Sequence, residues 1–273
     1  MPDVHPMNQL SINQLSTLRW EFQADAAAYA ARGLDGIGLY RPKIDDTGLT
    51  RSIDLLLSHN LRATSLSWAG GFTGSDGRGF EDAVGDAMAA IADAANLQAE
   101  TLVVLAGGRN NHIRRHARRT LCEALSRISI VAEEFGVQFA LEPIHPGCGE
   151  EWSFVNDIES TLAVIDEVGS PMLGMVLDTY HVGMDASVLS LLPRIAEKLQ
   201  LLQLGDGRHS PMGEMNRCLL GEGCVSNEAI VTTLLEHGYT GPIEAEVIGE
   251  DVETLCYEHV LDHTTTYLHR IAR

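Results

Sequence analysis

Residues 175–181 read MVLDTYH, an apolar run of strand character that ends in a carboxylate, a hydroxyl, a phenol and an imidazole. A run this apolar is typical of a strand that is buried on both faces, as in a parallel sheet covered by helices. The polar residues at its end must then face a cleft or a ligand. Two other stretches repeat the pattern, residues 137–145 with Glu142 and His145, and residues 242–247 with Glu246.

Length and composition describe a globular chain with a sizeable core. The 273 residues are 45% apolar, and no linker rich in proline, glycine and serine divides them, so we expect a single domain over residues 1–273. The formal charge of −19, from 19 basic and 38 acidic side chains, repels polyanions. This charge argues against nucleic acids and anionic membranes as partners and favours a small-molecule substrate.

Cysteine usage and the N-terminus indicate the compartment. The five cysteines are odd in number and form no CxxC pair, which disfavours a disulfide framework and a zinc knuckle. Residues 1–5 lack a basic segment followed by an apolar one, and no run approaches the roughly 20 apolar residues that span a bilayer. We therefore expect a soluble, cytoplasmic protein.

Short apolar runs alternate with longer amphipathic segments along the chain. Segments 81–97 and 117–135 have helical character, and Gly136 follows the second as a C-terminal capping residue would. Eight such alternations in about 250 residues predict a (β/α)8 barrel, with a doubly wound open sheet as the alternative. No GxGxxG motif follows the first strand, which favours the barrel. The expected strands are residues 9–13, 36–40, 63–68, 101–106, 137–142, 173–178, 201–204 and 243–248.

A barrel brings the carboxyl ends of its strands to one face, where Glu142, Asp178, Gln203 and Glu246 should meet. Three crowded carboxylates repel one another unless a divalent cation neutralises them, and an all-oxygen set favours Mn or Mg over zinc. Any one of these residues could instead be a helix N-cap or a salt-bridge partner. Glu244 shares the strand face of Glu246 and is the alternative ligand there.

Such a site suits proton abstraction next to a carbonyl group. A divalent ion that chelates a carbonyl and an adjacent hydroxyl stabilises the enolate formed on deprotonation. Glu142 and Glu246, on opposite sides, could then exchange protons as base and acid. Reprotonation gives an isomer or epimer, whereas loss of a β-hydroxyl gives a dehydration.

Residues 109–119 form a basic island in this acidic chain, RNNHIRRHARR. One interpretation is a solvated helix start. The other is that Arg109 or His112 binds a substrate carboxylate or phosphate over the barrel mouth.

Residues 206–217 form a loop long enough to be a lid or a binding element. Arg208 and Arg217 are its candidate substrate contacts, and His209 is an alternative to Gln203 as a metal ligand. His145 either contacts the substrate or a neighbouring site residue, or caps the loop that begins at Pro146. After the third strand, Trp68 either forms an apolar wall of the site or belongs to the core.

The order of these motifs resembles the xylose isomerase-like TIM-barrel superfamily over nearly the whole chain. This sugar-phosphate isomerase and epimerase group includes ketose 3-epimerases, inosose dehydratases, dehydroshikimate dehydratases and endonuclease IV. The resemblance rests on Leu141-Glu142-Pro143, Leu177-Asp178-Thr179-Tyr180-His181, Gln203-Leu204-Gly205-Asp206, Gly221-Glu222-Gly223, and Gly238-Tyr239-Thr240-Gly241-Pro242 leading to Glu246.

The resemblance implies a metal held by Glu142, Asp178, Gln203 and Glu246, with His181 just outside the ligands and in contact with substrate. Ketose epimerases of this group place histidine where Gln203 stands, whereas the dehydroshikimate dehydratase branch resembles this chain in using glutamine. Endonuclease activity fits the fold, but it does not fit the charge or the small number of histidines at strand ends.

We therefore expect a divalent-metal-dependent isomerase or epimerase of a small polyhydroxylated carbonyl compound, a sugar or a sugar phosphate. The alternatives are a metal-dependent dehydratase of the 3-dehydroshikimate or inosose type and a non-catalytic sugar-binding barrel. A homo-oligomer is compatible with a barrel of this kind, although no sequence feature fixes the number of subunits.

Overall fold

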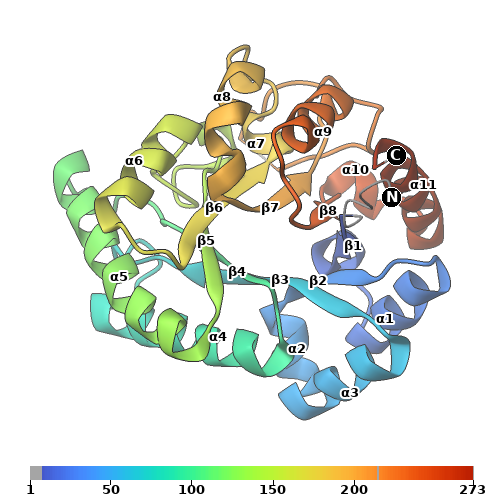
Figure 1. The fold of residues 1–273 in the computed structure, drawn as a ribbon, viewed down its shortest axis with the longest axis horizontal. Coiled ribbons are helices and arrows are strands. Elements are labelled where there is room, and N and C mark those ends of the chain that lie inside the picture. Colours follow the sequence, from blue (N-terminus) through green and yellow to red (C-terminus); the bar gives the residue numbers. More distant parts are fainter. Residues whose placement is uncertain (1–7, 214, 273) are drawn as a thin grey trace, which may run out of the picture.

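Eight parallel strands close into a barrel in the computed structural model, which describes residues 8–213 and 215–272. Each strand pairs with the next along the chain, and β1 closes the ring by pairing with β8. Figure 1 shows the strands at the centre and the helices around them. The predicted (β/α)8 barrel is confirmed, and closure of the sheet excludes the doubly wound alternative.

The strands lie close to the expected positions. They are β1 Leu10–Asn13, β2 Gly36–Tyr40, β3 Arg62–Gly70, β4 Thr101–Leu105, β5 Gln138–Glu142, β6 Leu173–Asp178, β7 Leu199–Leu204 and β8 Ile243–Ala245. The helices are α1 Phe22–Ala31, α2 Arg41–Thr47, α3 Leu49–His59, α4 Phe80–Leu97, α5 Arg114–Phe135, α6 Ile158–Val168, α7 Thr179–Val182, α8 Val188–Ile195, α9 Asn227–Glu236, α10 Glu250–Glu253 and α11 Tyr257–Ile271. Short 3-10 turns are η1 Gln14–Thr17, η2 Pro146–Cys148 and η3 Ala196–Lys198. Among the described residues, no helix has the length and apolar character needed to cross a membrane.

The last strand is shorter than the sequence predicts, because it ends at Ala245 rather than at residue 248. The backbone beyond Glu246 bonds to groups outside the barrel ladder. Val247 N donates to Ser16 Oγ at 2.9 Å, and Ile248 O accepts from Arg217 N at 3.0 Å. These bonds bring η1 and the loop after β7 over the end of β8.

The barrel interior has an apolar side and a polar side. On β4 to β7, alternate residues face inward and pack as a small cluster with Ile144, Cys148 and Tyr180; they are Val103, Leu105, Ala140, Val176 and Leu201. The intervening residues face the helices and join the large outer core. Because neighbouring positions alternate between the two faces, the inward-facing set continues to Glu142, Asp178 and Gln203 at the strand ends.

The polar side of the interior is centred on Glu244, whose side chain is fully buried. Its carboxylate accepts hydrogen bonds from Asn13 Nδ2 at 2.8 Å, Thr64 Oγ1 at 2.7 Å and Ser65 Oγ at 2.8 Å. Gly38 leaves room for it, since a Cβ there would lie 2.4 Å from Glu244 Oε2. A charge this deep requires such partners, because an unpaired buried carboxylate is strongly unfavourable.

A second buried charge holds the first two strand-to-helix connections together. Lys43 Nζ lies 2.7 Å from Asp25 Oδ2 and donates to the carbonyl oxygens of Gln14 and Thr17. The Lys43 side chain is 8% exposed and that of Asp25 is 0% exposed. The pair therefore ties η1 to α1 and α2 beneath the barrel mouth.

Replacing Lys43 by Met is expected to lower the free energy of unfolding by about 3–5 kcal/mol, because it leaves the Asp25 charge buried without its cation. Chemical denaturation of the wild type and the variant measures the loss. The matched control is Lys198→Met, which removes an exposed ion pair with Asp166 and should cost about 0–1 kcal/mol. Equal losses in the two variants would contradict the role given to the buried pair.

Candidate active site

The structure brings the four expected oxygen-bearing side chains to one end of the barrel. Glu142 and Asp178 are the last residues of β5 and β6, and Asp178 is in register with Gln203 of β7. Glu246 lies one residue beyond β8, where its N–H donates to Leu204 O at 3.0 Å. All four are buried, with exposures between 0% and 8%.

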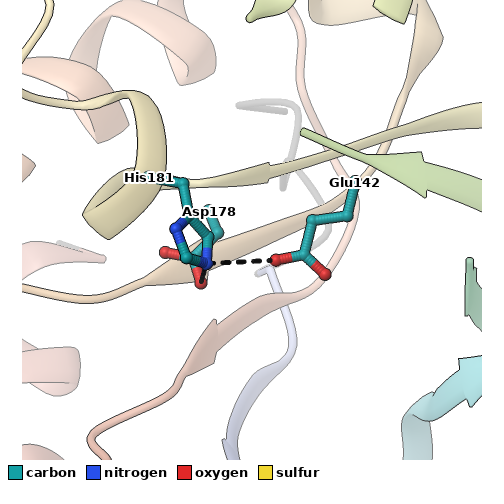
Figure 2. Close-up of side chains that lie close together, drawn as sticks. All are labelled: Glu142, Asp178 and His181. Carbon is teal, nitrogen blue, oxygen red and sulfur yellow. Dashed lines mark ion pairs between the residues drawn. The ribbon is translucent and has the colours of Figure 1, made fainter. Parts of the chain in front are cut away.

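Two of these four side chains, both carboxylates, form a cluster with His181 that could hold a metal ion. One donor atom from each of Glu142, Asp178 and His181 lies within 4.8 Å of the others. His181 Nε2 is 3.7 Å from Glu142 Oε1 and 3.9 Å from Asp178 Oδ2, as Figure 2 shows. The resemblance implied that His181 lies just outside the ligands, and in the structure its ring lies beside two of the expected ligands, Glu142 and Asp178.

The short helix α7 explains the position of His181. Asp178 is the N-cap of this helix, and its Oδ1 accepts the N–H of Tyr180 at 2.8 Å. Residues three apart on a helix lie on the same side, so His181 is brought beside Asp178. The same carboxylate therefore caps the helix through Oδ1 and faces the cluster through Oδ2.

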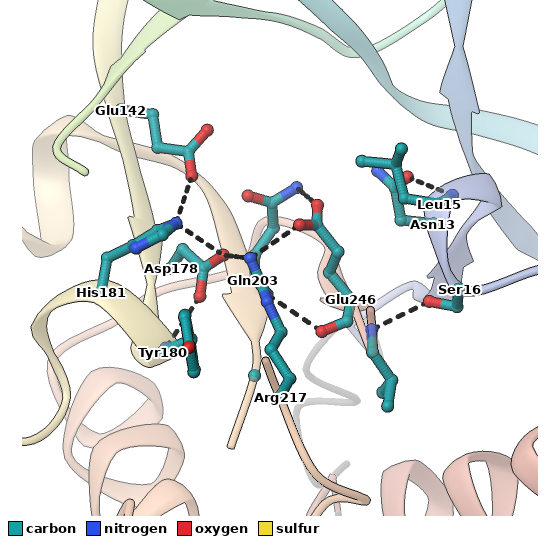
Figure 3. Close-up of polar contacts among 12 residues, drawn as sticks. Asn13, Leu15, Ser16, Glu142, Asp178, Tyr180, His181, Gln203, Arg217 and Glu246 are labelled. Carbon is teal, nitrogen blue, oxygen red and sulfur yellow. Dashed lines mark hydrogen bonds and ion pairs between the residues drawn. The ribbon is translucent and has the colours of Figure 1, made fainter. Parts of the chain in front are cut away.

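Arg217 enters the same site from the loop after β7. Its guanidinium Nη2 lies 2.8 Å from Asp178 Oδ2 and 2.7 Å from Glu246 Oε1, and Nη1 donates to Glu246 O. Figure 3 shows the guanidinium between these two side chains. Arg217 is 1% exposed and stacks over the Tyr180 ring at 4.8 Å. Arg217, which the sequence suggested as a substrate contact, thus forms buried ion pairs with Asp178 and Glu246.

The loop that delivers Arg217 is organised by a buried aspartate. Asp206 accepts the backbone N–H groups of Gly207, Gly221, Gly223 and Val225 at 2.9–3.1 Å. A Cβ at Gly223 would lie 2.1 Å from Asp206 Oδ1, so only glycine fits this close approach. Cys218 N donates to Asp206 O at 3.0 Å and thereby holds the residue next to Arg217.

Gln203 joins the two glutamates of the last strand. Its Nε2 donates to Glu244 Oε1 at 3.0 Å and to Glu246 Oε2 at 3.2 Å. Glu244, the alternative ligand, therefore lies below Gln203 in the barrel interior, where hydrogen bonds occupy both of its oxygens. Gln203 Oε1 is buried and has no hydrogen-bond partner among the described residues.

Burial and mutual repulsion shift the pKa values in this cluster. Burial raises the pKa of Glu142 well above its ordinary value, and the charges of Asp178 and Glu246 raise it further. Burial raises the pKa of Glu246 to about 7, although Arg217 opposes the shift. Burial lowers the pKa of His181 to about 4, so its ring is neutral at pH 7 and can donate a lone pair.

A cavity of about 390 Å³ opens above these residues at the barrel mouth. Glu142, His181, Arg217 and Glu246 line its inner end. Its outer wall is largely apolar, made by Leu15, Trp68, Leu105, Ile144, Trp152 and Met215. The two indole rings contact edge to face with centroids 5.7 Å apart. The volume suits a small molecule with one polar, reacting end.

Three sequence candidates lie outside this cavity. Arg208 is exposed and pairs with Asp251 at 3.3 Å and Glu222 at 3.5 Å. His209 is exposed and contacts the carbonyl of its neighbour Ser210, so the structure does not support it as a ligand in place of Gln203. Arg109 is exposed near the start of α5, as the solvated-helix interpretation of the basic island expects.

His145 occupies the capping position. Its Nδ1 accepts the Gly147 N–H at 3.0 Å at the start of η2, and its Nε2 lies 3.1 Å from Ser210 Oγ. It lines a separate cavity on the far side of His181. In the structure, His145 therefore caps the loop that begins at Pro146, which is one of the two roles that the sequence suggested.

Two residues that line the cavity carry no signal in the sequence. Cys148 is buried in the loop after β5, with its Sγ 3.5 Å from His181 Nδ1. Trp152 faces Trp68 across the mouth. Neither belongs to a motif or a periodic pattern, and only the path of the loop brings them to the site.

The donor set fits a divalent cation. Glu142, Asp178 and Glu246 bring three carboxylates to the site, and the guanidinium of Arg217 offsets one negative charge. Gln203 Oε1 adds a buried oxygen that accepts no hydrogen bond from residues 8–213 and 215–272. Oxygen donors suit Mg or Mn, and the neutral imidazole of His181 also suits zinc and related ions.

Several known proteins are similar to this chain in sequence. The inosose isomerase of Bacillus velezensis is 22% identical over 80% of this chain and 78% of its own length. The L-ribulose 3-epimerase of Methylomonas sp. is 28% identical over 87% of this chain and 85% of its own. The chain spans only about half the length of two further inosose isomerases that it matches, 51% and 54%.

Solved structures share the fold. A structure of the IOLI protein with a bound zinc atom superposes with a TM-score of 0.84 at 20% identity, over 97% of this chain and 98% of that one. Residues 26–266 match the family described as "Xylose isomerase-like TIM barrel". The chain therefore belongs to the xylose isomerase-like TIM barrel family.

Proposed function

We propose that this protein is a divalent-metal-dependent isomerase or epimerase of a small polyhydroxylated carbonyl compound, a sugar or sugar phosphate. The observation that carries the proposal is the pair of buried carboxylates, Glu142 and Glu246, that line one small cavity from different strands. The named relatives, an inosose isomerase and an L-ribulose 3-epimerase, support the reaction class.

In this proposal, four side chains would hold the cation: Glu142, Asp178, Gln203 and Glu246. His181 lies close enough to Glu142 and Asp178 to join them. A bound divalent ion would polarise the substrate carbonyl and offset the charge that develops on its oxygen. Arg217 orients the carboxylates of Asp178 and Glu246 through its ion pairs and limits their rotation.

The two glutamates are proposed to exchange the proton. Glu246 is proposed as the base that removes the proton. Glu142, which lines the cavity from β5, is proposed to return one. The apolar wall around Trp68 and Trp152 excludes water from the reacting end and so protects the intermediate.

A dehydratase is the second candidate, and Gln203 is the residue that favours it, because the dehydroshikimate dehydratase branch that this chain resembles has glutamine there. The first step is the same proton abstraction. The outcomes differ in whether the β-hydroxyl group leaves the intermediate before a proton returns.

Incubation with Mn²⁺ in D2O tests both candidates. A panel of ketoses, ketose phosphates, an inosose and dehydroshikimate would be analysed by NMR and mass spectrometry. An isomerase or epimerase incorporates deuterium at the carbon beside the carbonyl, whereas a dehydratase gives a product lighter by one water. Sugar binding without exchange or water loss would overturn the enzymatic proposal in favour of a binding barrel.

The affinity for Mn²⁺ is expected to rise as the pH rises through about 7. Glu246 has a raised pKa, so below about pH 7 it holds a proton that must leave when an ion binds. Displacing one proton changes the affinity by up to about tenfold per pH unit. Isothermal titration calorimetry at several pH values measures the slope. The Glu246→Gln variant lacks this proton and should show a shallower slope, whereas equal slopes would contradict the assignment.

A further inference from the structure

The orientation of the Gln203 amide is decided by its neighbours. Both acceptors of its Nε2 are carboxylate oxygens, at 3.0 Å on Glu244 and 3.2 Å on Glu246. Turning the amide over would place Oε1 against these oxygens, which would remove two hydrogen bonds and add repulsion. Figure 3 shows the nitrogen toward Glu246 and the oxygen on the side of Glu142 and His181.

Glu244 is itself fixed as an acceptor. Asn13 Oδ1 accepts the backbone N–H of Leu15 at 3.0 Å, which forces Asn13 Nδ2 to face Glu244 Oε1 at 2.8 Å. Thr64 and Ser65 hydroxyls lie at 2.7 Å and 2.8 Å from its Oε2. A backbone donor in η1 therefore determines, through Asn13 and Glu244, which way the Gln203 amide points.

The oxygen that this arrangement presents is buried without a partner in the part of the chain that the structure describes. Gln203 Oε1 is buried and accepts no hydrogen bond from the described residues, and Gln203 is 1% exposed. A buried acceptor without a partner is unfavourable unless a ligand satisfies it. The cluster of Glu142, Asp178 and His181 lies on the side to which it points.

We infer that Glu244 is a positioning residue, which holds the Gln203 amide with Oε1 toward the cation and so sets the strength of cation binding. The inference rests on the proposed function and deepens it. Glu244 does not line the 390 Å³ cavity, and in this account it binds no ion. It acts through Gln203 alone, as partners beyond the ligands commonly do in metal sites.

A calorimetric titration with Mn²⁺ tests the inference. In Glu244→Gln, the buried charge that attracts Nε2 of Gln203 is lost and Glu246 is the carboxylate that still accepts from it, so the amide is held less firmly. We expect the Mn²⁺ affinity to fall about 10–100-fold. Thr64→Val is the matched control, because it removes one donor to Glu244 but keeps the contact with Gln203. It should lower the melting temperature and leave the affinity unchanged within error.

Exchanging the two residues separates orientation from folding. In Gln203→Glu combined with Glu244→Gln, total charge is kept, and the carboxylate at 203 has two equivalent oxygens that need no orientation. Its affinity should return toward that of the wild type and exceed that of either single variant. Visible absorption of the Co²⁺-loaded forms, which depends on the ligands of the ion, should rank the variants in the same order of cation binding.

Two results would overturn the inference alone. One is a wild type that binds Mn²⁺ with an affinity that Glu244→Gln leaves unchanged. The other is an exchanged variant that folds but binds no better than Gln203→Glu, which would limit Glu244 to a structural role. A wild type that binds no Mn²⁺ or Co²⁺ overturns the proposed function as well.

Discussion

Replacing Glu246 by Gln is expected to lower kcat by about 10²–10⁴-fold at saturating Mn²⁺, since an amide cannot accept the proton that the base removes. The substitution keeps the shape of the side chain and one of its two contacts, because a single amide oxygen can accept from Arg217 or from Gln203 but not from both. It also removes one charge from a crowded acidic cluster, so stability should not fall. The loss in kcat is measured as the rate of deuterium exchange into the substrate that the D2O incubation identifies.

The matched control for this prediction is Glu250→Gln. Glu250 is an exposed acidic residue of α10, four positions along the chain and outside the cavity. It should exchange deuterium at the wild-type rate. If Glu246→Gln also exchanged at that rate with Mn²⁺ bound, Glu246 would not be the base.

Replacing Arg217 by Met is expected to lower the free energy of unfolding of the protein prepared without metal by about 3–5 kcal/mol. The guanidinium is the partner of both Asp178 and Glu246, and these carboxylates stay buried when it is lost. Added Mn²⁺ should stabilise this variant more than the wild type, because the ion then compensates charges that no guanidinium offsets.

Denaturation with and without Mn²⁺ measures both parts of this prediction. Arg208→Met is the control from the same loop, since its ion pairs with Glu222 and Asp251 are exposed and should contribute about 0–1 kcal/mol. Equal losses in Arg217→Met and Arg208→Met would contradict the central position of Arg217. An identical gain from Mn²⁺ in variant and wild type would contradict the charge argument.

The strand ends were predictable because their pattern is local. An apolar run that stops at Glu142 or Asp178 shows where a strand leaves the core, and the fixed alternation of a strand decides which side chains face inward. The closed barrel then brings distant segments together by a general rule of the fold. For this reason, the fold and the meeting of four strand ends followed from sequence alone.

Other features depended on contacts that no local pattern encodes. β8 ends early because Ser16 and Arg217, far away in sequence, bond to the backbone that follows it. Arg208 and Arg217 looked equivalent in the loop, but the hydrogen bonds of Asp206 turn only the second toward the barrel. Glu244 and Glu246 share a strand face, and their difference in depth appears only when the neighbouring strands are in place.

His181 and His145 show the same limit. Both follow polar strand ends in the sequence, and only the path of the chain separates their roles. The single turn of α7 brings His181 back beside Asp178, whereas the 3-10 turn η2 takes the Nδ1 of His145 as its cap. The role of a histidine near a strand end therefore cannot be assigned from its position in the sequence.

The metal content of the protein tests the central claim most directly. Wild type, Asp178→Asn and the exposed control Asp251→Asn would be incubated with Mn²⁺, passed through gel filtration and analysed for manganese per chain. The account predicts about one ion per chain in the wild type and the control, and loss of the ion in Asp178→Asn. A wild type that stays free of metal after this treatment, or an Asp178→Asn variant that retains its ion, would contradict it.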